Sequence, residues 1–306
     1  MSGQTQLGAQ GLLDARYHAY LATVAHLRPL LHRYCTRMVG SVLDGEDVMQ
    51  EALFEAYGKL DMLTDPRALR SWLFRIAHNR CIDFLRNRGA RHKAEMTYAE
   101  DTEQEVALPD EPLAAGLNQA MERLVVHLPP KERACVLLKD VFDHSLEEIA
   151  TLVESTVGGV KAALNRGRAK LAALAVEPGK QTTGERRSDP NLSRLLHLYV
   201  ERFNRRDWQG VRDLTSADAR LRVSDCYAGL LADSPYFVEY ERASAPWRMT
   251  IGEIDGEEVV LVLSHDGREW RPTSVVRVST IGDRIERISD YRGCSWLLPA
   301  ASSAAH

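Results

Sequence analysis

The sequence predicts a multi-domain protein in which an all-α N-terminal half is followed by an α+β domain. At 306 residues the chain is longer than one typical domain. Apolar residues recur at helical spacing from about residue 12 to 92 and again from about 113 to 176. After about residue 190, runs such as PTSVVRVSTIGDRIERISDYRG alternate β-branched and polar residues between GD and DG turns, which predicts an antiparallel sheet of hairpins.

The composition is typical of a globular protein with reduced thiols. Apolar residues make up 44% of the chain and charged residues 27%. No apolar run reaches the ~18 residues of a membrane span, and MSGQTQLGAQ at the start lacks the pattern of a signal peptide. The five cysteines include no CxxC pair and no histidine partner at zinc spacing. We therefore expect a cytoplasmic protein without a metal, a cofactor or a membrane partner.

Charge is distributed in blocks, although the net charge is only −4. Residues 70–93 carry seven Lys or Arg and one acid, residues 95–111 carry seven acids and no Lys or Arg, and residues 158–170 carry four Lys or Arg and no acid. Two basic surfaces joined by an acidic segment suggest a protein that binds a polyanion at two places. The expected boundaries are 12–92 and 113–176 for the helical domains, 93–112 and 177–189 for the linkers, and 190–300 for the α+β domain.

The stretch SWLFRIAHNRCIDFLRNR, residues 71–88, predicts an amphipathic helix with an additional polar row. At 100° per residue, Arg75, Asn79 and Arg86 fall within about 40° of one another, beside the apolar face. Core packing does not require such a row, whereas guanidinium and amide groups suit phosphates and base edges. Trp72, at the edge of the apolar face, could stack on an unpaired base. The alternative is an ordinary surface helix with its tryptophan in the core.

Residues 145–171 predict a helix-turn-helix that opens with a capping box of Ser145 and Glu148. Apolar residues at i, i+4 and i+11 from Val160 give the second helix a core side. A core side and a basic side are what a recognition helix needs in a DNA groove. An acidic linker would repel phosphates, but it fits a basic channel in a partner that otherwise holds nucleic acid. The polar residues off the apolar stripe are Lys161, Asn165, Arg166, Arg168 and Lys170.

Three stretches together resemble an extracytoplasmic-function (ECF) sigma factor of bacterial RNA polymerase. DGEDVMQEALFEAY (44–57) resembles the polymerase-binding helix of region 2, and SWLFRIAHNRCIDFLR (71–86) resembles the helix that binds the −10 promoter element. LPPKERACVLLKDVFDHSLEEIATLVESTVGGVKAALNRGRAKL (128–171) resembles region 4, which binds the −35 element. The resemblance covers about residues 15–175 in the order and spacing of the family. It implies all-α regions 2 and 4, a helix-turn-helix in region 4, and no enzymatic activity.

The resemblance assigns residues to three surfaces. It implies that the chain grips the β′ clamp helices of core RNA polymerase, contacts its β flap and binds promoter DNA at two elements. Arg80 could instead pair with Asp83 at i, i+3. The assigned residues are Asp47, Gln50, Glu51 and Phe54 for polymerase, Trp72, Arg75, Asn79, Arg80 and Arg86 for the −10 element, and Lys161, Asn165, Arg166 and Arg168 for the −35 element.

Two departures from the family pattern concern the helix-turn-helix. Its turn usually carries a glycine where this chain has Glu154 and then Ser155, and a non-glycine residue at positive φ costs ~1 kcal/mol. We therefore expect a looser or differently shaped turn. Ala162 and Ala163 stand where polar or basic residues are common, and alanine reaches only a thymine methyl group. Direct readout of the −35 element is therefore expected to be weak or altered.

Residues 190–300 resemble a SnoaL-like domain of the nuclear transport factor 2 (NTF2) superfamily, a cone of helices on a curved antiparallel sheet. LYVERFNRRDWQGVRDLTSADARL (198–221) resembles its opening helices, and VVRVSTIGDRIERISDYRG (275–293) its closing hairpin. Superfamily enzymes use acid–base groups in the pocket, but no pair here has a spacing that demands catalysis. The resemblance implies a domain that regulates regions 2 and 4 in cis and could hold a small-molecule ligand. The candidate pocket residues are Asp225, Tyr227, His265, Asp290 and Tyr291.

The sequence therefore predicts a sigma factor that directs transcription initiation at specific promoters under the control of its C-terminal domain. One alternative is a stand-alone helix-turn-helix regulator with a ligand-sensing domain. A second is a SnoaL-type small-molecule enzyme with an appended DNA-binding half. The polymerase-binding helix and the acidic linker argue against the first alternative, and the second leaves more than half of the chain without a role.

Overall fold

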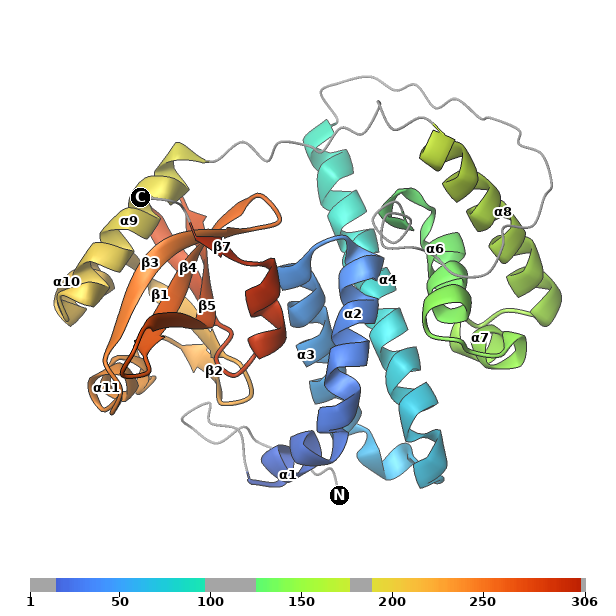
Figure 1. Ribbon diagram of the computed structural model, residues 1–306, viewed down its shortest axis with the longest axis horizontal. Coiled ribbons are helices and arrows are strands. Elements are labelled where there is room, and N and C mark those ends of the chain that lie inside the picture. The colour runs from blue at the N-terminus through green and yellow to red at the C-terminus, as the bar shows by residue number, and fades with distance from the viewer. Residues whose placement is uncertain (1–14, 97–124, 177–188, 304–306) are drawn as a thin grey trace. The chain divides into compact units, whose positions relative to one another are not determined.

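The structure, a computed structural model, describes residues 15–96, 125–176 and 189–303. The chain divides into two compact units, Thr23–Thr183 and Gly184–His306, the second of which includes Met1–Ala22. The described part of the first unit is helical and the second is α+β, which confirms the predicted fold class (Figure 1). The expected linker 93–112 lies outside the described residues from residue 97 onward, and the linker 177–189 lies outside them up to residue 188.

Helices account for most of the described residues 15–96. The helix that carries the −10 row runs to Met96, beyond the expected domain end at residue 92. The elements are α1 (Ala15–Val24), η1 (Ala25–Leu27), α2 (Arg28–Val39), α3 (Val42–Gly58), η2 (Leu60–Met62), η3 (Pro66–Ala68) and α4 (Leu69–Met96).

Helices α2, α3 and α4 pack around a shared apolar core. Tyr34 on α2, Leu53 on α3 and Phe74 on α4 are all within 1% of complete burial. The α2–α3 approach is close because α3 carries Gly45, where a Cβ atom would lie 2.6 Å from the Cα of Thr36. A side chain at this position would push the two helices apart. The core therefore fixes the direction in which α4 presents its polar row.

The second group of helices includes the predicted helix-turn-helix. The group consists of η4 (Val125–His127), α6 (Pro130–Val136), the π-helical η5 (Leu137–Val141), α7 (Leu146–Leu152) and α8 (Val157–Val176), of which α7 and α8 are the two helices of the helix-turn-helix. Both halves of the capping box at the start of α7 are present, with Glu148 N donating to Ser145 Oγ and Ser145 N donating to Glu148 Oε2. Gly167 brings α8 against α6, because a Cβ atom there would lie 2.8 Å from Val136 Cγ2.

The turn between α7 and α8 is hydrogen-bonded rather than loose. Glu154 itself adopts the left-handed conformation, with φ of 50°. Val153 N donates to Ile149 O at 2.9 Å, and Ser155 N donates to Ala150 O at 2.8 Å. The turn is therefore not looser, contrary to the expectation. Glu154 adopts, at some cost in strain, the left-handed conformation that glycine would adopt without strain.

The second unit contains one seven-stranded sheet in the order β2-β1-β6-β5-β4-β3-β7. All neighbouring strands are antiparallel except β1 and β6, which are parallel, and irregularities interrupt the register in β1, β4 and β5. Such bulges bend a sheet and produce the predicted curvature. The elements are α9 (Pro190–Asn204), α10 (Trp208–Asp213), β1 (Thr215–Val223), β2 (Tyr227–Leu230), α11 (Tyr236–Glu241), β3 (Trp247–Ile254), β4 (Glu257–His265), β5 (Trp270–Ile281), β6 (Arg284–Asp290), η7 (Ser295–Ala300) and β7 (Ser302–Ser303).

Local chemistry explains how this unit closes. The predicted DG turn joins β3 to β4, with Asp255 at φ 54° and Gly256 at φ 75°, as a two-residue hairpin of type I′ requires. Helix α9 is fixed to the sheet by Asn204, whose side-chain amide both donates to Met249 O (2.9 Å) and accepts from Met249 N (2.7 Å). The core lies where the apolar sides of α9 and α11 meet strand β1 and strands β3–β6.

Candidate nucleic-acid interface

Helix α4 presents the predicted −10 row on its solvent side. Arg75 and Asn79 are exposed, and neither makes a polar contact within the described ranges 15–96, 125–176 and 189–303. Phe74 and Ala77, on the opposite side, are fully buried. A guanidinium and an amide are thus held in water by a rigid helix, in the state from which they can bind phosphates or base edges.

The other two cationic candidates on α4 differ from each other. Arg80 Nε lies 2.5 Å from Glu55 Oε2 on α3, so Arg80 does not pair with Asp83 as the i, i+3 spacing allowed. Burial of Glu55 opposes its ionisation, but hydrogen bonds from Lys59 and Arg80 lower its pKa overall. Arg86 has an exposed side chain and approaches Asp83 only to 3.8 Å. Arg80 therefore fixes α4 to α3, whereas Arg86 keeps a weakly paired guanidinium at the surface.

A cavity of about 460 Å³ lies beside Trp72, where α4 begins. Trp72 is half-buried, so it belongs neither to the core, as the alternative supposed, nor to the open surface. Met62, Leu63 and Leu152 give the cavity apolar walls, and Arg75 adds a cation to its lining. Three acids line it as well, Asp65, Glu147 and Glu148. The volume lies within the range of small-molecule pockets. An aromatic ring, apolar walls and a guanidinium are the groups that bind an unstacked base and its phosphate.

The basic and amide residues of α8 divide into two sets, and the first set is paired within the chain. Arg166 Nε lies 2.9 Å from one carboxylate oxygen of Glu132, and Lys170 Nζ lies 3.0 Å from the other. Arg168 binds Asp140 through two hydrogen bonds, Nε–Oδ2 at 3.0 Å and Nη2–Oδ1 at 2.5 Å. These cations hold α8 against α6 and η5. Arg166 and Arg168, both assigned to the −35 element, therefore have structural partners.

The second set, Lys161 and Asn165, faces solvent. Both side chains are exposed and make no polar contact with any residue that the structure describes. Ala162 lies exposed between them, whereas Ala163 is buried against the core. Besides the paired Arg166, these exposed residues of α8 therefore offer one cation without a polar contact, one amide and one methyl group. Of the two alanine departures, only Ala162 is placed to alter groove contacts.

Helix α3 carries the residues assigned to polymerase. Asp47, Gln50, Glu51 and Phe54 are spaced at i, i+3, i+4 and i+7, which places them along one side of the helix. Phe54 is 45% exposed, which is unusual for a large apolar side chain. Gln50 Nε2 donates to Glu46 Oε1 at 2.7 Å, so its amide is oriented by the preceding turn.

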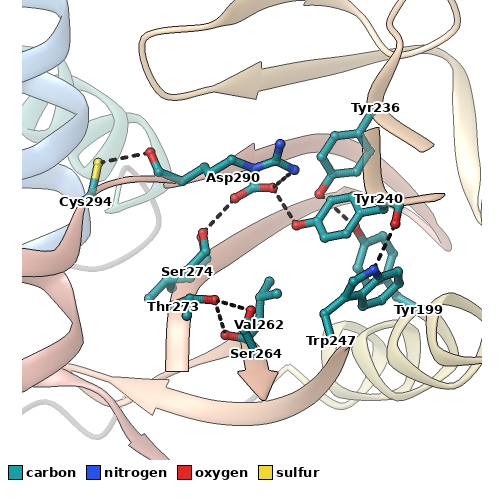
Figure 2. A network of polar contacts seen from close by, with 12 residues as sticks. Tyr199, Tyr236, Tyr240, Trp247, Val262, Ser264, Thr273, Ser274, Asp290 and Cys294 are labelled. Atoms are coloured by element: carbon teal, nitrogen blue, oxygen red, sulfur yellow. Dashed lines mark hydrogen bonds and ion pairs between the residues drawn. The ribbon is translucent and has the colours of Figure 1, made fainter. Parts of the chain in front are cut away.

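In the second unit, Asp290 lies at the centre of a buried polar network (Figure 2). It is 1% exposed. Tyr240 donates to Oδ2 and Ser274 donates to Oδ1, each at 2.7 Å, and Arg292 Nη2 lies 3.7 Å from Oδ2. Burial and the nearby carboxylate raise the pKa of Tyr240 well above its ordinary value, which keeps its hydroxyl a donor. Both carboxylate oxygens are thus engaged, and a general base needs one oxygen within reach of a substrate.

The structure does not bring the five pocket candidates together. Tyr227 lines a cavity of about 230 Å³ with Tyr236, Glu239 and Arg292. His265 lies at the β4–β5 hairpin, where its Nδ1 accepts from Gly267 N at 3.1 Å. The candidates lie apart because period-2 alternation predicts which face of the sheet a strand residue occupies, but not how far along the sheet the residue lies. Asp225, His265, Asp290 and Tyr291 do not line this cavity.

Sequence reasoning missed the phenylalanine and tyrosine rings of an aromatic cluster that reaches Asp290 through Tyr240, although it considered Trp208 and Trp247 as a possible pocket lining. Phe203 on α9 lies within 6.0 Å, centroid to centroid, of six other aromatic rings. Tyr236 and Tyr240 stand at i and i+4 on α11, a spacing that could have indicated a shared face. These rings occupy much of the space between the helices and the sheet. They are Tyr199, Trp208, Tyr236, Phe237, Tyr240 and Trp247.

Two features are absent from the described residues, a membrane-spanning helix and a metal-binding cluster. None of the described helices combines the length and the apolar character that crossing a membrane requires. Among the same residues, no group of three His, Cys, Asp or Glu side chains is arranged to hold a metal ion.

Comparisons with known proteins agree with the resemblance. The Sigma-70 region 2 family matches residues 23–91, and the Sigma-70 region 4 family matches residues 118–171. The chain is 31% identical over 150 residues to the ECF RNA polymerase sigma factor SigW of Bacillus subtilis. The alignment covers 46% of this chain and 80% of SigW.

Two further similar proteins come from Mycobacterium tuberculosis. The chain is 28% identical over 229 residues to the ECF RNA polymerase sigma factor SigG. The alignment covers 67% of this chain and 61% of SigG. The chain thus spans less than two thirds of the length of that relative. The crystal structure of the extracytoplasmic function sigma factor SigJ can be superposed over 90% of this chain and 97% of the SigJ chain. The sequence identity is 16% and the TM-score is 0.32.

Proposed function

We propose that this chain, which belongs to the family of ECF RNA polymerase sigma factors, directs bacterial RNA polymerase to specific promoters. One observation carries the proposal: on both predicted DNA-binding helices, a cation and an amide are exposed without an intrachain partner among the described residues. Sites for phosphates and bases need such groups, whereas cations that serve the fold are already paired. A cytoplasmic location is part of this proposal, because bacterial transcription takes place there.

For the −10 element, we assign contact roles to four of the five candidates. Arg75 and Arg86 bind phosphates of the opened strand, and Asn79 reads a base edge. Trp72 stacks on a base at the cavity. Arg80 acts as a positioning residue, because its ion pair with Glu55 orients α4 relative to α3.

For the −35 element, Lys161 and Asn165 are the groove contacts. Asn165 can bind adenine through two hydrogen bonds, and Lys161 can reach guanine or a phosphate. Ala162 leaves only a methyl contact at the centre of this face. Arg166 and Arg168 support the helix through Glu132 and Asp140, so direct readout at the −35 element rests on few side chains.

Polymerase binding is assigned to the side of α3 that carries Asp47, Gln50, Glu51 and Phe54. An exposed phenyl ring beside the acids Asp47 and Glu51 matches the anchor-and-rim composition of protein interfaces, whereas Gln50 is only 4% exposed and supports this surface through Glu46. The β′ clamp helices are the proposed partner of this surface, and the β flap is the proposed partner of the helix-turn-helix.

The C-terminal α+β unit is proposed to regulate the helical unit in cis and to catalyse no reaction. The engaged state of Asp290 supports this, because both of its oxygens serve the fold. If a small-molecule ligand controls this unit, its proposed site is the cavity beside Tyr227 and Arg292. Deletion from residue 190 onward should change transcription activity, and unchanged activity with unchanged polymerase affinity would contradict a regulatory role.

Transcription with purified core enzyme tests the proposal. Full-length protein and core enzyme are incubated with fragmented genomic DNA of the source organism, and RNA 5′ ends are sequenced. The expected result is a set of start sites that share two upstream motifs and require the protein. Asn79→Ala and Lys161→Ala should each lower initiation by roughly tenfold, since one base contact contributes ~1–3 kcal/mol.

Two matched variants serve as controls. Asn87→Ala removes an exposed amide from another side of α4, and Lys131→Ala removes an exposed cation from α6. Both should initiate as the wild type does. The proposal fails if no start site depends on the protein, or if the protein does not co-elute with core polymerase. A promoter-binding protein that never co-elutes would instead be a stand-alone regulator.

A further inference from the structure

A second cavity of the α+β unit lies where α10, the start of β1 and the segment that leads into α11 meet. Its volume is about 220 Å³, and no described residue lines both this cavity and the one beside Tyr227. The cavity coincides with an irregularity of the sheet, where β1 advances from residue 215 to 220 while β6 advances only from residue 285 to 287. Extra residues on one strand bulge out of the ladder, so β1 departs from the regular sheet at this cavity.

Arg212 supplies this cavity with a cation. The residue is exposed, and its guanidinium carbon lies 4.8 Å from the centre of the Phe237 ring, which also lines the cavity. The guanidinium makes no ion pair and no hydrogen bond with any residue that the structure describes. Asp213 and Asp218 are close in sequence, but no acid among the described residues lines the cavity. The fork of Arg212 is therefore available to a carboxylate, which an arginine can bind through two parallel hydrogen bonds.

The cavity beside Tyr227 is a poorer site for an anion. Its arginine, Arg292, already lies 3.7 Å from a carboxylate oxygen of Asp290. Glu239 also lines that cavity and adds a negative charge to it. An anion there would compete with one carboxylate and be repelled by another. Of these two cavities, the one at Arg212 is therefore the better site for a negatively charged ligand.

A hydroxyl group without a partner marks the same place. Ser216 lines the cavity, and its Oγ is buried and makes no hydrogen bond with the described residues. Few buried polar groups in native proteins stay unpaired. A change of rotamer about χ1 would let this hydroxyl donate to a ligand oxygen in the cavity. The hydroxyl of Thr215, in contrast, already donates to Arg212 O at 2.8 Å. Ser216 is thus a second donor for an anion.

The remaining walls decide what kind of anion fits. Ala219, Leu231 and Phe237 line the cavity and are each no more than 5% exposed, so its floor is apolar. The volume lies below the ~300–1,000 Å³ of sites for drug-sized ligands. We infer that this cavity binds a small organic carboxylate. Its carboxylate group accepts hydrogen bonds from Arg212 and Ser216, and its hydrocarbon part packs against Phe237. Inorganic phosphate would leave the apolar floor unfilled.

Titration of the full-length protein with sodium benzoate tests this inference without DNA or polymerase. Benzoate joins a carboxylate to a small apolar ring, and benzamide has nearly the same shape without the charge. Leucine methyl groups are labelled with ¹³C, because Leu231 lines this cavity and Leu221 lines the cavity beside Tyr227. Benzoate should bind with a Kd in the millimolar range or below, as for other very small ligands, and shift Leu231 more than Leu221. Benzamide and inorganic phosphate should bind about tenfold more weakly.

Four variants localise the binding. Arg212→Gln removes the cation at an exposed position and should weaken benzoate binding about tenfold. Ser216→Ala should weaken it about threefold. Ala232→Trp places a large ring at an exposed lining position and should abolish binding. The matched control is Arg220→Gln, at an exposed arginine of β1 outside the cavity lining, which should bind as the wild type does.

Methyl spectra of the ligand-free variants show whether each one keeps the fold, so that lost binding is not mistaken for unfolding. Equal benzoate affinity in wild type and Arg212→Gln would overturn the inference, as would equal affinity for benzoate and benzamide. Larger shifts at Leu221 than at Leu231, or no binding at millimolar benzoate, would do the same. Unchanged affinity in Ser216→Ala would overturn the role of the hydroxyl.

Discussion

His78 gives the α2–α4 core a predictable sensitivity to acid. Its Nδ1 lies 2.9 Å from the Tyr34 hydroxyl, and the residue is 6% exposed. Burial holds the pKa of Tyr34 well above its ordinary value, so the hydroxyl stays protonated and can donate to a neutral imidazole. Burial also lowers the pKa of His78 from 6.5 to about 4. Protonating His78 in the folded state would therefore put a charge into this core.

The size of the effect follows from that difference in pKa. Above pH 7 the ring is neutral in both the folded and the unfolded chain, and pH has no influence through it. Between pH 6.5 and about 4 the unfolded chain binds the proton and the folded chain does not, so stability falls as pH falls. At 1.36 kcal/mol per pKa unit, the loss is about 2 kcal/mol at pH 5 and about 3 kcal/mol below pH 4.

Amide hydrogen exchange, corrected for the intrinsic effect of pH, measures this loss in α2 and α4 separately from the other unit. The opening free energy of these helices should fall by about 2 kcal/mol between pH 7.5 and 5. His78→Gln, which keeps a hydrogen-bond partner for Tyr34 but does not titrate, should remove most of that fall. His26→Gln, at an exposed histidine, should not. An equal fall in wild type and His78→Gln would refute the reasoning.

Three further predictions concern single contacts. Glu154→Gly should stabilise the helix-turn-helix by about 1 kcal/mol by relieving the left-handed conformation at φ 50°; a lower melting temperature would contradict this. Arg168→Ala should destabilise α6–α8 by ~1–2 kcal/mol through loss of the two hydrogen bonds to Asp140, whereas affinity of the folded protein for promoter duplex, measured by anisotropy, should stay the same. Asp290→Ala should lower the unfolding free energy of the α+β unit by ~2–3 kcal/mol, since Tyr240 loses a buried acceptor; unchanged thermal stability would argue against the network described above.

Local patterns predicted the fold because the signals that define it lie close together in the sequence. The capping box of Ser145 and Glu148 involves residues three positions apart, and the Asp255–Gly256 turn joins two strands that pair directly. The sequence also showed that Glu154 occupies a position suited to glycine. It could not show that the backbone keeps the left-handed conformation there, because the packing of α7 and α8 decides whether that strain is tolerated.

The candidate sites were predicted less completely, because a helical wheel gives the direction of a side chain but not what approaches it. The acids that bind Arg80, Arg166 and Arg168 stand 25, 34 and 28 positions away along the chain. Nothing in local spacing identifies such partners. The Asp290 network has the same origin, since its donors come from α11 and β5, 50 and 16 positions away.

Pairing within the chain therefore separates two kinds of cation that look alike in sequence. An arginine whose fork is already filled by a carboxylate, as Arg168 is by Asp140, must break that pair before it can bind phosphate. Arg75 and Lys161 have no such cost among the described residues. They give up only water, and phosphate binding releases counterions from the nucleic acid. The division also explains why basic residues cluster beyond what contact with DNA requires: on α8, part of the cluster serves to hold the remainder in place.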